Sequence, residues 1–527
     1  MKKVKILTPE EAALLVNDGD TIATGGFVSC ACPETLSKAL EKRYVETGHP
    51  KDMTLFYAAG QGYRGTPGSG GDHFAHEGMV KRVVGGHWDR APGLGKLALE
   101  NKIEAYNLPQ GVITHMYRDI AAHNIGTITH VGLYTFADPR NGGGKLNEVT
   151  KEDLVKLIEI EGEERLLYKG FPINVVFLRG SYCDERGNCT VHREVGPMDV
   201  TAMAQACKNS GGKVIVQVEK IVAAGSLDPK LVKIPGIYVD AVVVGTDEDN
   251  MQCIGVPYDG AAAGEYTIPL DAIPSIPLNE RKVIARRAAM ELPNDAIVNL
   301  GTGMPEMIAN VAAEEGISDK MTLTVEAGPI GGIPLAGPQF GAAANAEAIL
   351  EHNVQFDFYQ GGGLDVAFLG LAETAPNGDL NVSKFGTRLA GSGGFVDITQ
   401  NAKKVCYCGT FTAKVPDRTK PKFKIGDGQI KVLQEGTKKK FVKEVEHITF
   451  SGVYANKVKQ PVLYITERAV FELRPEGVTL IEIAPGIDLK TEILDQMEFE
   501  PAIAYQEDGT IKLMDERIFR DEPMGLE

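Results

Sequence analysis

Short apolar runs alternate with longer amphipathic stretches along most of the chain. Residues 175–178, 214–218 and 241–244 are rich in Val and other apolar side chains, a composition typical of buried β-strands. The stretch from Lys151 to Ile160 is interpreted as one of the helices between such strands. This alternation predicts an α/β fold in which mixed or parallel sheets are flanked by helices.

One plan of elements occurs twice. Residues 20–26 form a short β-run with a Gly turn, and Pro33-Glu34 then open a helix. Residues 295–303 followed by Pro305-Glu306 repeat this arrangement. Pro suits the first helical position, and an acidic residue suits the first turn.

Further matches follow in the same order along the chain, and the last two share an offset of 191 residues without a gap. A common order and a common offset indicate a duplication rather than chance. The matched pairs are 52–60 with 320–328, 177–188 with 368–379, and 213–216 with 404–407.

The duplication predicts two homologous open α/β domains, residues 1–275 and 285–527. The first carries an insertion of about 80 residues, because the offset falls between the early and late matches. Residues 260–279, rich in Gly, Ala and Pro, are the expected linker.

The two halves differ at one aligned strand end, where the first has Ala58 and the second has Glu326. A carboxylate at the C-terminal end of a strand, beside a Gly-rich turn, lies where open α/β sheets bind ligands. Glu326 is therefore the candidate catalytic residue. The alternative is a solvated glutamate at a strand end, which is what most glutamates are.

Three glycine-rich loops of the second half could expose backbone N–H groups to a ligand. Gly301, Thr302 and Gly303 form a β-to-helix turn whose N–H groups could hold an oxyanion. Each loop alone also fits an ordinary turn or bulge. The other two loops contribute Gly361, Gly362 and Gly363, and Gly391, Gly393 and Gly394.

Competing motifs are incomplete. The loop at Gly301 has Glu306 where a dinucleotide fingerprint needs its last glycine, and Lys145 is followed by Leu146 rather than Ser or Thr. The His73, His76 and His87 group lacks metalloprotease spacing, so these histidines are expected to be structural. The eight cysteines form no CxxC pair and are expected to be reduced, buried thiols, so no metal site is predicted.

Bulk properties narrow the functional class. At 527 residues the chain is longer than one hydrophobic core usually supports, so two or more domains are expected. Its net charge of −16 argues against a nucleic-acid-binding protein. The N-terminal residues lack the apolar core of a signal peptide, and no apolar run is long enough to span a membrane. We therefore expect a soluble, cytoplasmic protein without membrane segments.

Several segments together resemble the class I CoA-transferases, most closely the single-chain propionate/acetate branch. Succinate-type relatives carry Ser-Glu-Asn-Gly at the active site, whereas this chain has Val-Glu-Ala-Gly. The segments that carry the resemblance are Gly25-Gly26-Phe27 with Pro33-Glu34, Pro109-Gln110-Gly111, Gly301-Thr302-Gly303, Val325 to Gly328, Gly391 to Gly394, and Tyr464 to Phe471.

The resemblance implies fused α- and β-subunit-like halves and a ping-pong reaction through a glutamyl-CoA thioester on Glu326. CoA would be a co-substrate, with no permanently bound cofactor, and propionate, acetate and lactate would be substrates. A dimer or tetramer of identical chains is expected. The carboxyl pKa of Glu326 should not be strongly raised, because the ionised form attacks.

The resemblance also assigns the neighbours of Glu326. Oxyanion and CoA contacts are expected from the loops at Gly301–Gly303 and Gly391–Gly394, and Gln110 and Gly361–Gly363 are expected to contact substrate or CoA. Arg118 could contact the acyl carboxylate or form a surface ion pair. Two other functions remain open: an acyl-CoA hydrolase on the same fold, and a non-catalytic acyl-CoA-binding protein.

Overall fold

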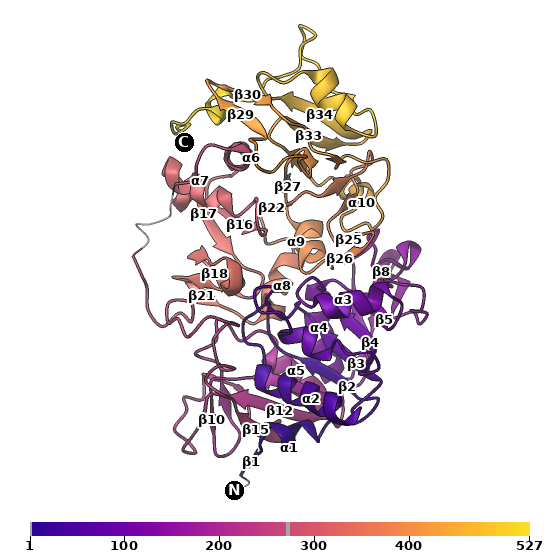
Figure 1. Cartoon of the computed structure of the whole chain (residues 1–527), viewed down its shortest axis with the longest axis vertical. Coiled ribbons are helices and arrows are strands. Elements are labelled where there is room, and N and C mark those ends of the chain that lie inside the picture. Colours follow the sequence, from indigo (N-terminus) through magenta and orange to yellow (C-terminus); the bar gives the residue numbers. More distant parts are fainter. Residues whose placement is uncertain (1–2, 270–274, 527) are drawn as a thin grey trace. The chain divides into compact units, whose positions relative to one another are not determined.

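The computed structural model describes residues 3–269 and 275–526 (Figure 1). The chain forms two compact units. The first unit contains residues 1–268, 325–358 and 386–397, and the second contains 269–324, 359–385 and 398–527. Two segments of the second sequence half thus belong to the first unit. The boundaries at 275 and 285 describe the sequence repeat and stay a prediction; part of the expected linker, residues 270–274, lies outside the described residues.

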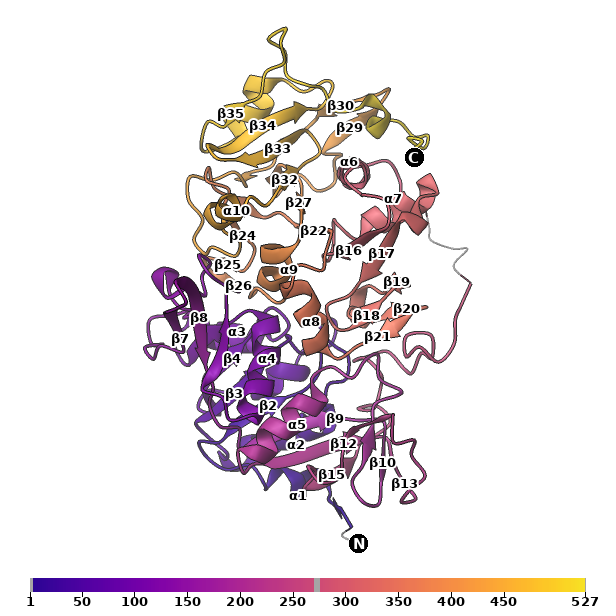
Figure 2. The same ribbon diagram turned by 180° about the vertical axis from the view of Figure 1, so that it is seen from behind.

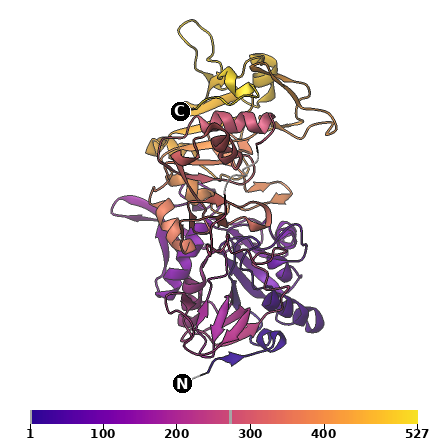
Figure 3. The same ribbon diagram turned by 90° about the vertical axis from the view of Figure 1, so that its left-hand side faces the viewer.

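The first unit is built on an eight-stranded parallel sheet in the order β1-β15-β12-β9-β2-β3-β4-β5. Figure 3 shows β1 beside the N-terminus, at one end of this unit. The strands are β1 (Lys5–Ile6), β2 (Thr21–Thr24), β3 (Met53–Tyr57), β4 (Val80–Gly85), β5 (Glu104–Asn107), β9 (Val175–Arg179), β12 (Lys213–Val218) and β15 (Ala241–Val244).

Helices cover both faces of this sheet. Leu55 and Tyr57 of β3 lie in one apolar core with residues of α1 (Pro9–Ala13), α2 (Glu34–Thr47) and α3 (Pro92–Leu99). Phe56, on the opposite face, contacts Tyr117 of α4 (Gln110–Ala121) with ring centroids 4.9 Å apart. Helix α4 packs against α5 (Val200–Asn209). Burial on both faces explains why these strands are apolar throughout.

In the second unit, strands lie side by side in the order β17-β16-β22-β27-β32-β33-β34-β35 (Figure 2). The strands from β17 to β32 are parallel, whereas β33 pairs antiparallel with β32 and β34. Helices α6 (Glu280–Ala289) and α7 (Met307–Glu315) share an apolar core with this sheet. No helix in the described ranges is both long and apolar enough to cross a membrane. The strands are β16 (Ala296–Leu300), β17 (Met321–Thr324), β22 (Val366–Gly370), β27 (Val405–Cys408), β32 (Val462–Ile465), β33 (Ala469–Arg474), β34 (Gly477–Ile483) and β35 (Ala502–Ile503).

The strand orders confirm the predicted duplication. The run β15-β12-β9-β2-β3 of the first unit has the same parallel order as β32-β27-β22-β16-β17 of the second. The strands matched by sequence, such as β3 with β17 and β9 with β22, occupy equivalent places. Residues 58–174, between β3 and β9, hold the insertion, since only residues 325–365 lie between the equivalent strands β17 and β22. The α/β fold with two homologous halves is therefore confirmed.

The helix predicted for residues 151–160 is wrong. Val155–Ile160 form strand β7, which pairs antiparallel with β8 (Glu163–Lys169) in a small sheet with β6 (Gly126–Thr129). Val155 lies opposite Tyr168, and Leu157 lies opposite Leu166. Cross-strand pairing of β-branched and aromatic side chains outweighs local helix propensity in so short a segment.

The cysteine prediction needs one correction. Cys30 and Cys253 form a disulfide, whereas all eight cysteines were expected to be reduced. The other six are free and buried, as expected. Spacing along the chain gave no sign of this pair, because its members lie 223 residues apart.

His73 and His76 are structural, as predicted. His73 lies between Glu34, 3.1 Å from Nε2, and Glu41, 2.6 Å from Nδ1, and His76 contacts the other oxygen of Glu41. Burial alone would lower the pKa of the His73 imidazole, but the hydrogen bonds to Glu34 and Glu41 raise it to about 9.

A folded-state pKa above the unfolded value of 6.5 means that the stabilisation from His73 is present below pH 6.5 and is lost as pH rises through about 9. At pH 6, His73→Gln should lower the free energy of unfolding by about 1–3 kcal/mol. The thermal unfolding midpoint should therefore fall at pH 6 and change less at pH 10. The exposed pair of His49 and Asp18 supplies the control: His49→Gln should change little at either pH. An equal effect of His73→Gln at both pH values would contradict the assignment.

Candidate active site

Glu326 lies two residues beyond the end of β17, in a tight turn. The N–H of Val325 donates to the carbonyl of Pro329, and that of Gly328 donates to Val325. Gly328 has φ +129°, and a Cβ there would lie 2.2 Å from the carbonyl oxygen of Leu350. Only glycine fits this position, so the turn after the strand holds Glu326 at a fixed place.

Gln110 is the first residue of α4 and is 2% exposed. Its Nε2 donates to Oε1 of Glu326 at 3.4 Å. Its backbone N–H donates to the carbonyl of Gly393, and the N–H of Gly393 donates in turn to Gly86. The predicted substrate-side residue Gln110 and the predicted loop at Gly393 are thus brought together beside Glu326.

Gly394 lies directly against the carboxylate. A Cβ at this position would be 3.2 Å from Cδ of Glu326 and 3.1 Å from Cζ of Phe356. Gly391 and Gly393 have φ values of +79° and +55°, in the left-handed region that favours glycine. The loop Gly391–Gly394 therefore turns its backbone, rather than side chains, toward Glu326.

Sequence reasoning missed two buried residues, His352 and Asp199. His352 opens α8 (His352–Gln360), and its Nε2 lies 3.0 Å from Nε2 of Gln110. Its Nδ1 lies 2.9 Å from Oδ2 of Asp199. Neither residue belongs to a recognisable motif, and the contacts span 242 and 153 residues of sequence.

The carboxyl group of Glu326 is in a mixed environment. Burial raises its pKa above the ordinary value of a glutamate, and the hydrogen bond from Gln110 acts in the opposite direction. A positive charge on His352 would add to this lowering only while its imidazole is protonated. The prediction that the pKa of Glu326 is not strongly raised did not take burial into account, and burial is the largest influence on this pKa. As a whole residue, Glu326 is intermediate in exposure rather than fully buried.

His87 borders the same loops. A Cβ at Gly60 would lie 2.7 Å from Nδ1 of His87, and one at Gly393 would lie 3.4 Å from its Cδ2. Burial and the nearby guanidinium of Arg90 lower the pKa of His87 to about 4. Nδ1 of His87 is buried without a hydrogen-bond partner within the described residues, so the structural role expected for His87 stays a prediction.

The other predicted loops belong to the second unit. The N–H of Gly301 donates to the carbonyl of Phe368, and that of Gly303 donates to the carboxylate of Glu306. Gly361–Gly363 follow the last turn of α8, where the N–H of Gly362 donates to Tyr359. The roles of Gly301–Gly303 and Gly361–Gly363 toward CoA stay predictions.

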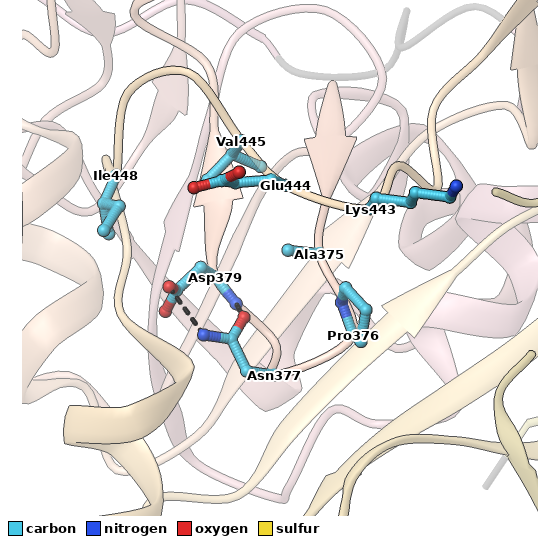
Figure 4. A pocket seen from close by; sticks show the side chains of 8 residues that line it. All are labelled: Ala375, Pro376, Asn377, Asp379, Lys443, Glu444, Val445 and Ile448. Atoms are coloured by element: carbon cyan, nitrogen blue, oxygen red, sulfur yellow. Dashed lines mark hydrogen bonds between the residues drawn. The ribbon is translucent and has the colours of Figure 1, made fainter. Parts of the chain in front are cut away.

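Two pockets away from these residues carry no predicted chemistry. Figure 4 shows one of about 290 Å³ in the second unit, lined by the turn from Ala375 to Asp379 and by residues 443–448. Asp379 accepts hydrogen bonds there from Asn377 and from the N–H of Gly452, so its carboxylate is engaged in holding the turn. A second pocket, in the first unit, is bordered by Asn188, which matches Asp379 in the repeat.

Comparison with known proteins points to one family. The Coenzyme A transferase family model matches residues 6–245 and 281–448. A caffeate CoA-transferase of Acetobacterium woodii is 47% identical over 530 residues, covering 99% of each chain. The acetate CoA-transferase YdiF of Escherichia coli K12 is 45% identical over 528 residues, 99% of this chain and 97% of the relative. The crystal structure of E. coli O157:H7 YdiF as a thioester complex with CoA matches with a TM-score of 0.92 at 43% identity, covering 100% of this chain and 98% of that one.

The Gln110 amide should help to keep Glu326 ionised, since a donor favours the charged form of a carboxyl. Gln110→Leu removes that donor and should move the titration of Glu326 to higher pH. Difference infrared spectroscopy of the carboxyl band, with Glu326→Gln as the reference, measures this. Arg118 lies on the same helix in a surface ion pair with Asp357, so Arg118→Leu is the control and should titrate as the wild type. An unchanged or lowered Glu326 titration in Gln110→Leu would contradict this assignment.

Proposed function

Since this chain belongs to the Coenzyme A transferase family, we propose that it moves CoA between short-chain monocarboxylates through a glutamyl-CoA thioester on Glu326. The observation that supports this most is the position of Glu326, whose carboxylate accepts a hydrogen bond from Gln110 and lies against the backbone of Gly394. A related protein of 43% identity forms a thioester complex with CoA.

The reaction needs no general base, because an ionised carboxylate is itself the nucleophile. An oxygen of Glu326 attacks the thioester carbonyl of acyl-CoA, and the CoA thiolate leaves, giving a mixed anhydride. The thiolate then attacks the glutamyl carbonyl and displaces the acyl group as a free carboxylate. Glutamyl-CoA remains, and an acceptor carboxylate reverses both steps to complete a ping-pong cycle.

Each addition step builds negative charge on a carbonyl oxygen. The N–H of Gly394 donates to no backbone acceptor within the described ranges, so it is available to such an oxygen. A well-placed donor lowers the barrier by roughly 3 kcal/mol. His352 does not serve as a base for water, since its two ring nitrogens face Gln110 and Asp199. The site thus favours transfer between carboxylates over hydrolysis.

We propose propionate, acetate and lactate as acyl groups, although one relative acts on acetate and another on caffeate. A difference of one methylene between two acyl groups changes their discrimination by only ~1–3 kcal/mol.

A panel of donor acyl-CoAs tested against acceptor acids, aromatic acids included, would rank the substrates by kcat/KM. The proposal also includes a cytoplasmic location and a dimer or tetramer, the latter testable by light scattering.

Intact-protein mass spectrometry can detect the covalent intermediate directly. Mixed with acyl-CoA in the absence of acceptor, the wild type should gain the mass of one CoA less one water. Glu326→Ala should gain nothing and should lose at least about 10⁴-fold in transfer rate, as expected when a nucleophile is removed. Glu347→Ala, which alters an exposed glutamate of the same segment, is the control and should behave as the wild type. Adduct formation in Glu326→Ala would refute the assignment.

Thiol release separates transfer from hydrolysis and from simple binding. A transferase passes CoA from the donor acyl group to an acceptor carboxylate. Free CoA thiol should therefore not accumulate in steady state, with or without acceptor. Continuous accumulation without acceptor would indicate a hydrolase. Tight binding of acyl-CoA with neither exchange nor adduct would indicate a non-catalytic acyl-CoA-binding protein.

A further inference from the structure

A buried line of hydrogen bonds runs from Asp199 through His352 and Gln110 to Glu326. The successive distances are 2.9 Å, 3.0 Å and 3.4 Å. Asp199, His352 and Gln110 are at most 6% exposed, so water does not compete for these contacts. Glu326, at the end of the line, is the least buried of the four residues.

The chemistry of the two ends fixes the direction of every proton between them. An ionised Glu326 accepts, so the Gln110 group that faces it must be the NH₂. The same nitrogen faces Nε2 of His352, which must therefore accept and carry no proton. The imidazole proton is then on Nδ1, where it donates to Asp199. With the other tautomer, an Nε2–H would meet the NH₂ of Gln110, and the amide would have to turn its oxygen toward Glu326.

We propose that Asp199 and His352 are positioning residues that set the His352 tautomer and thereby hold the N–H of Gln110 toward Glu326. This inference rests on the proposed function and names two residues that act on it through Gln110. A carboxylate that fixes an imidazole tautomer is a recurrent device of active sites.

The geometry gives this arrangement a role in the second half of the cycle. If Oε2 is the oxygen that attacks acyl-CoA and leaves with the acyl group, then Oε1, next to Gln110, stays on Glu326 as the carbonyl oxygen of the thioester. Attack by the acceptor carboxylate on that carbonyl builds negative charge on the same oxygen. An N–H already directed there stabilises the transition state without rearrangement, whereas an amide oxygen there would repel the charge.

The surroundings hold His352 in place. Its backbone N–H donates to the carbonyl of Met198, the neighbour of Asp199. Its ring meets Phe27 edge to face at 5.5 Å and lies 5.0 Å from Phe356. Oδ1 of Asp199 has no hydrogen-bond partner within the described part of the chain. A buried carboxylate with a single hydrogen-bond partner lowers the stability of the fold. This cost favours a functional role for Asp199, namely its hydrogen bond with Nδ1 of His352.

Two substitutions of similar size separate positioning from packing. In His352→Gln, an amide reaches the place of Nε2 and can accept from Gln110 while donating to Asp199. In His352→Asn, the shorter amide reaches only the place of Nδ1 and leaves Gln110 without its partner. We expect His352→Gln to keep kcat within about fivefold, and His352→Asn to lower it by about 10- to 100-fold with KM for acyl-CoA little changed. Equal losses in both variants, at equal thermal stability, would overturn the proposal.

Asp199→Asn tests the tautomer itself. The amide can present its NH₂ to Nδ1 and so favour the Nε2–H form, and we expect a loss of about 10- to 100-fold in the rate at which glutamyl-CoA is consumed by acceptor. In ¹⁵N-histidine-labelled protein, the resonances lost in His352→Gln identify this ring. They should show a protonated Nδ1 and bare Nε2 in the wild type and the reverse in Asp199→Asn. A wild-type ring protonated on Nε2 would overturn the proposal.

These outcomes are distinct from failure of the proposed function. Wild-type protein that forms no CoA adduct would refute Glu326 as nucleophile whatever the variants do. Wild-type protein that forms the adduct, together with an Asp199→Asn variant of unchanged turnover and folding, would refute the positioning role alone.

Discussion

The chemistry depends on a carboxylate that must be ionised in a place where burial opposes ionisation. Water would keep Glu326 charged, but it would also compete with the acceptor for the thioester. Burial excludes water and strengthens each local dipole, at the cost of raising the carboxyl pKa. The hydrogen bond from Gln110 acts against that rise. The pKa of Glu326 is thus set by two opposite effects, burial, which raises it, and the hydrogen bond from Gln110, which lowers it.

The residues that surround the Glu326 carboxylate come from segments far apart in the sequence. Gln110 comes from helix α4 of the first repeat, Glu326 from the end of a strand in the second repeat, and Gly394 from a later loop. All three belong to the first compact unit, because residues 325–358 and 386–397 pack with it. Backbone hydrogen bonds join them directly: Gln110 donates to Gly393, and Gly393 donates to Gly86. The proposed nucleophile Glu326 and the groups that contact it therefore lie in one compact unit.

The repeat made Glu326 predictable, because the aligned Ala58 showed that strand geometry alone does not require a carboxylate there. Gln110 and the Gly391–Gly394 loop followed from resemblance, and the structure brings them to Glu326. Asp199 and His352 could not be found this way, because each is chemically ordinary until folding places it opposite a partner more than 150 residues away. Residues 151–160 failed as a helix for a similar reason: strand pairing, which is non-local, decides their conformation.

The same comparison explains why each chain should carry a single site. At the equivalent strand end of the first half, Ala58 is 3% exposed, and a Cβ at Gly86 would lie 2.2 Å from its carbonyl oxygen. Helix α4 of the first repeat directs Gln110 toward the carboxylate of the other repeat. The first repeat thus contributes the donor Gln110 and the second contributes Glu326, so the proposed site needs both halves of the chain.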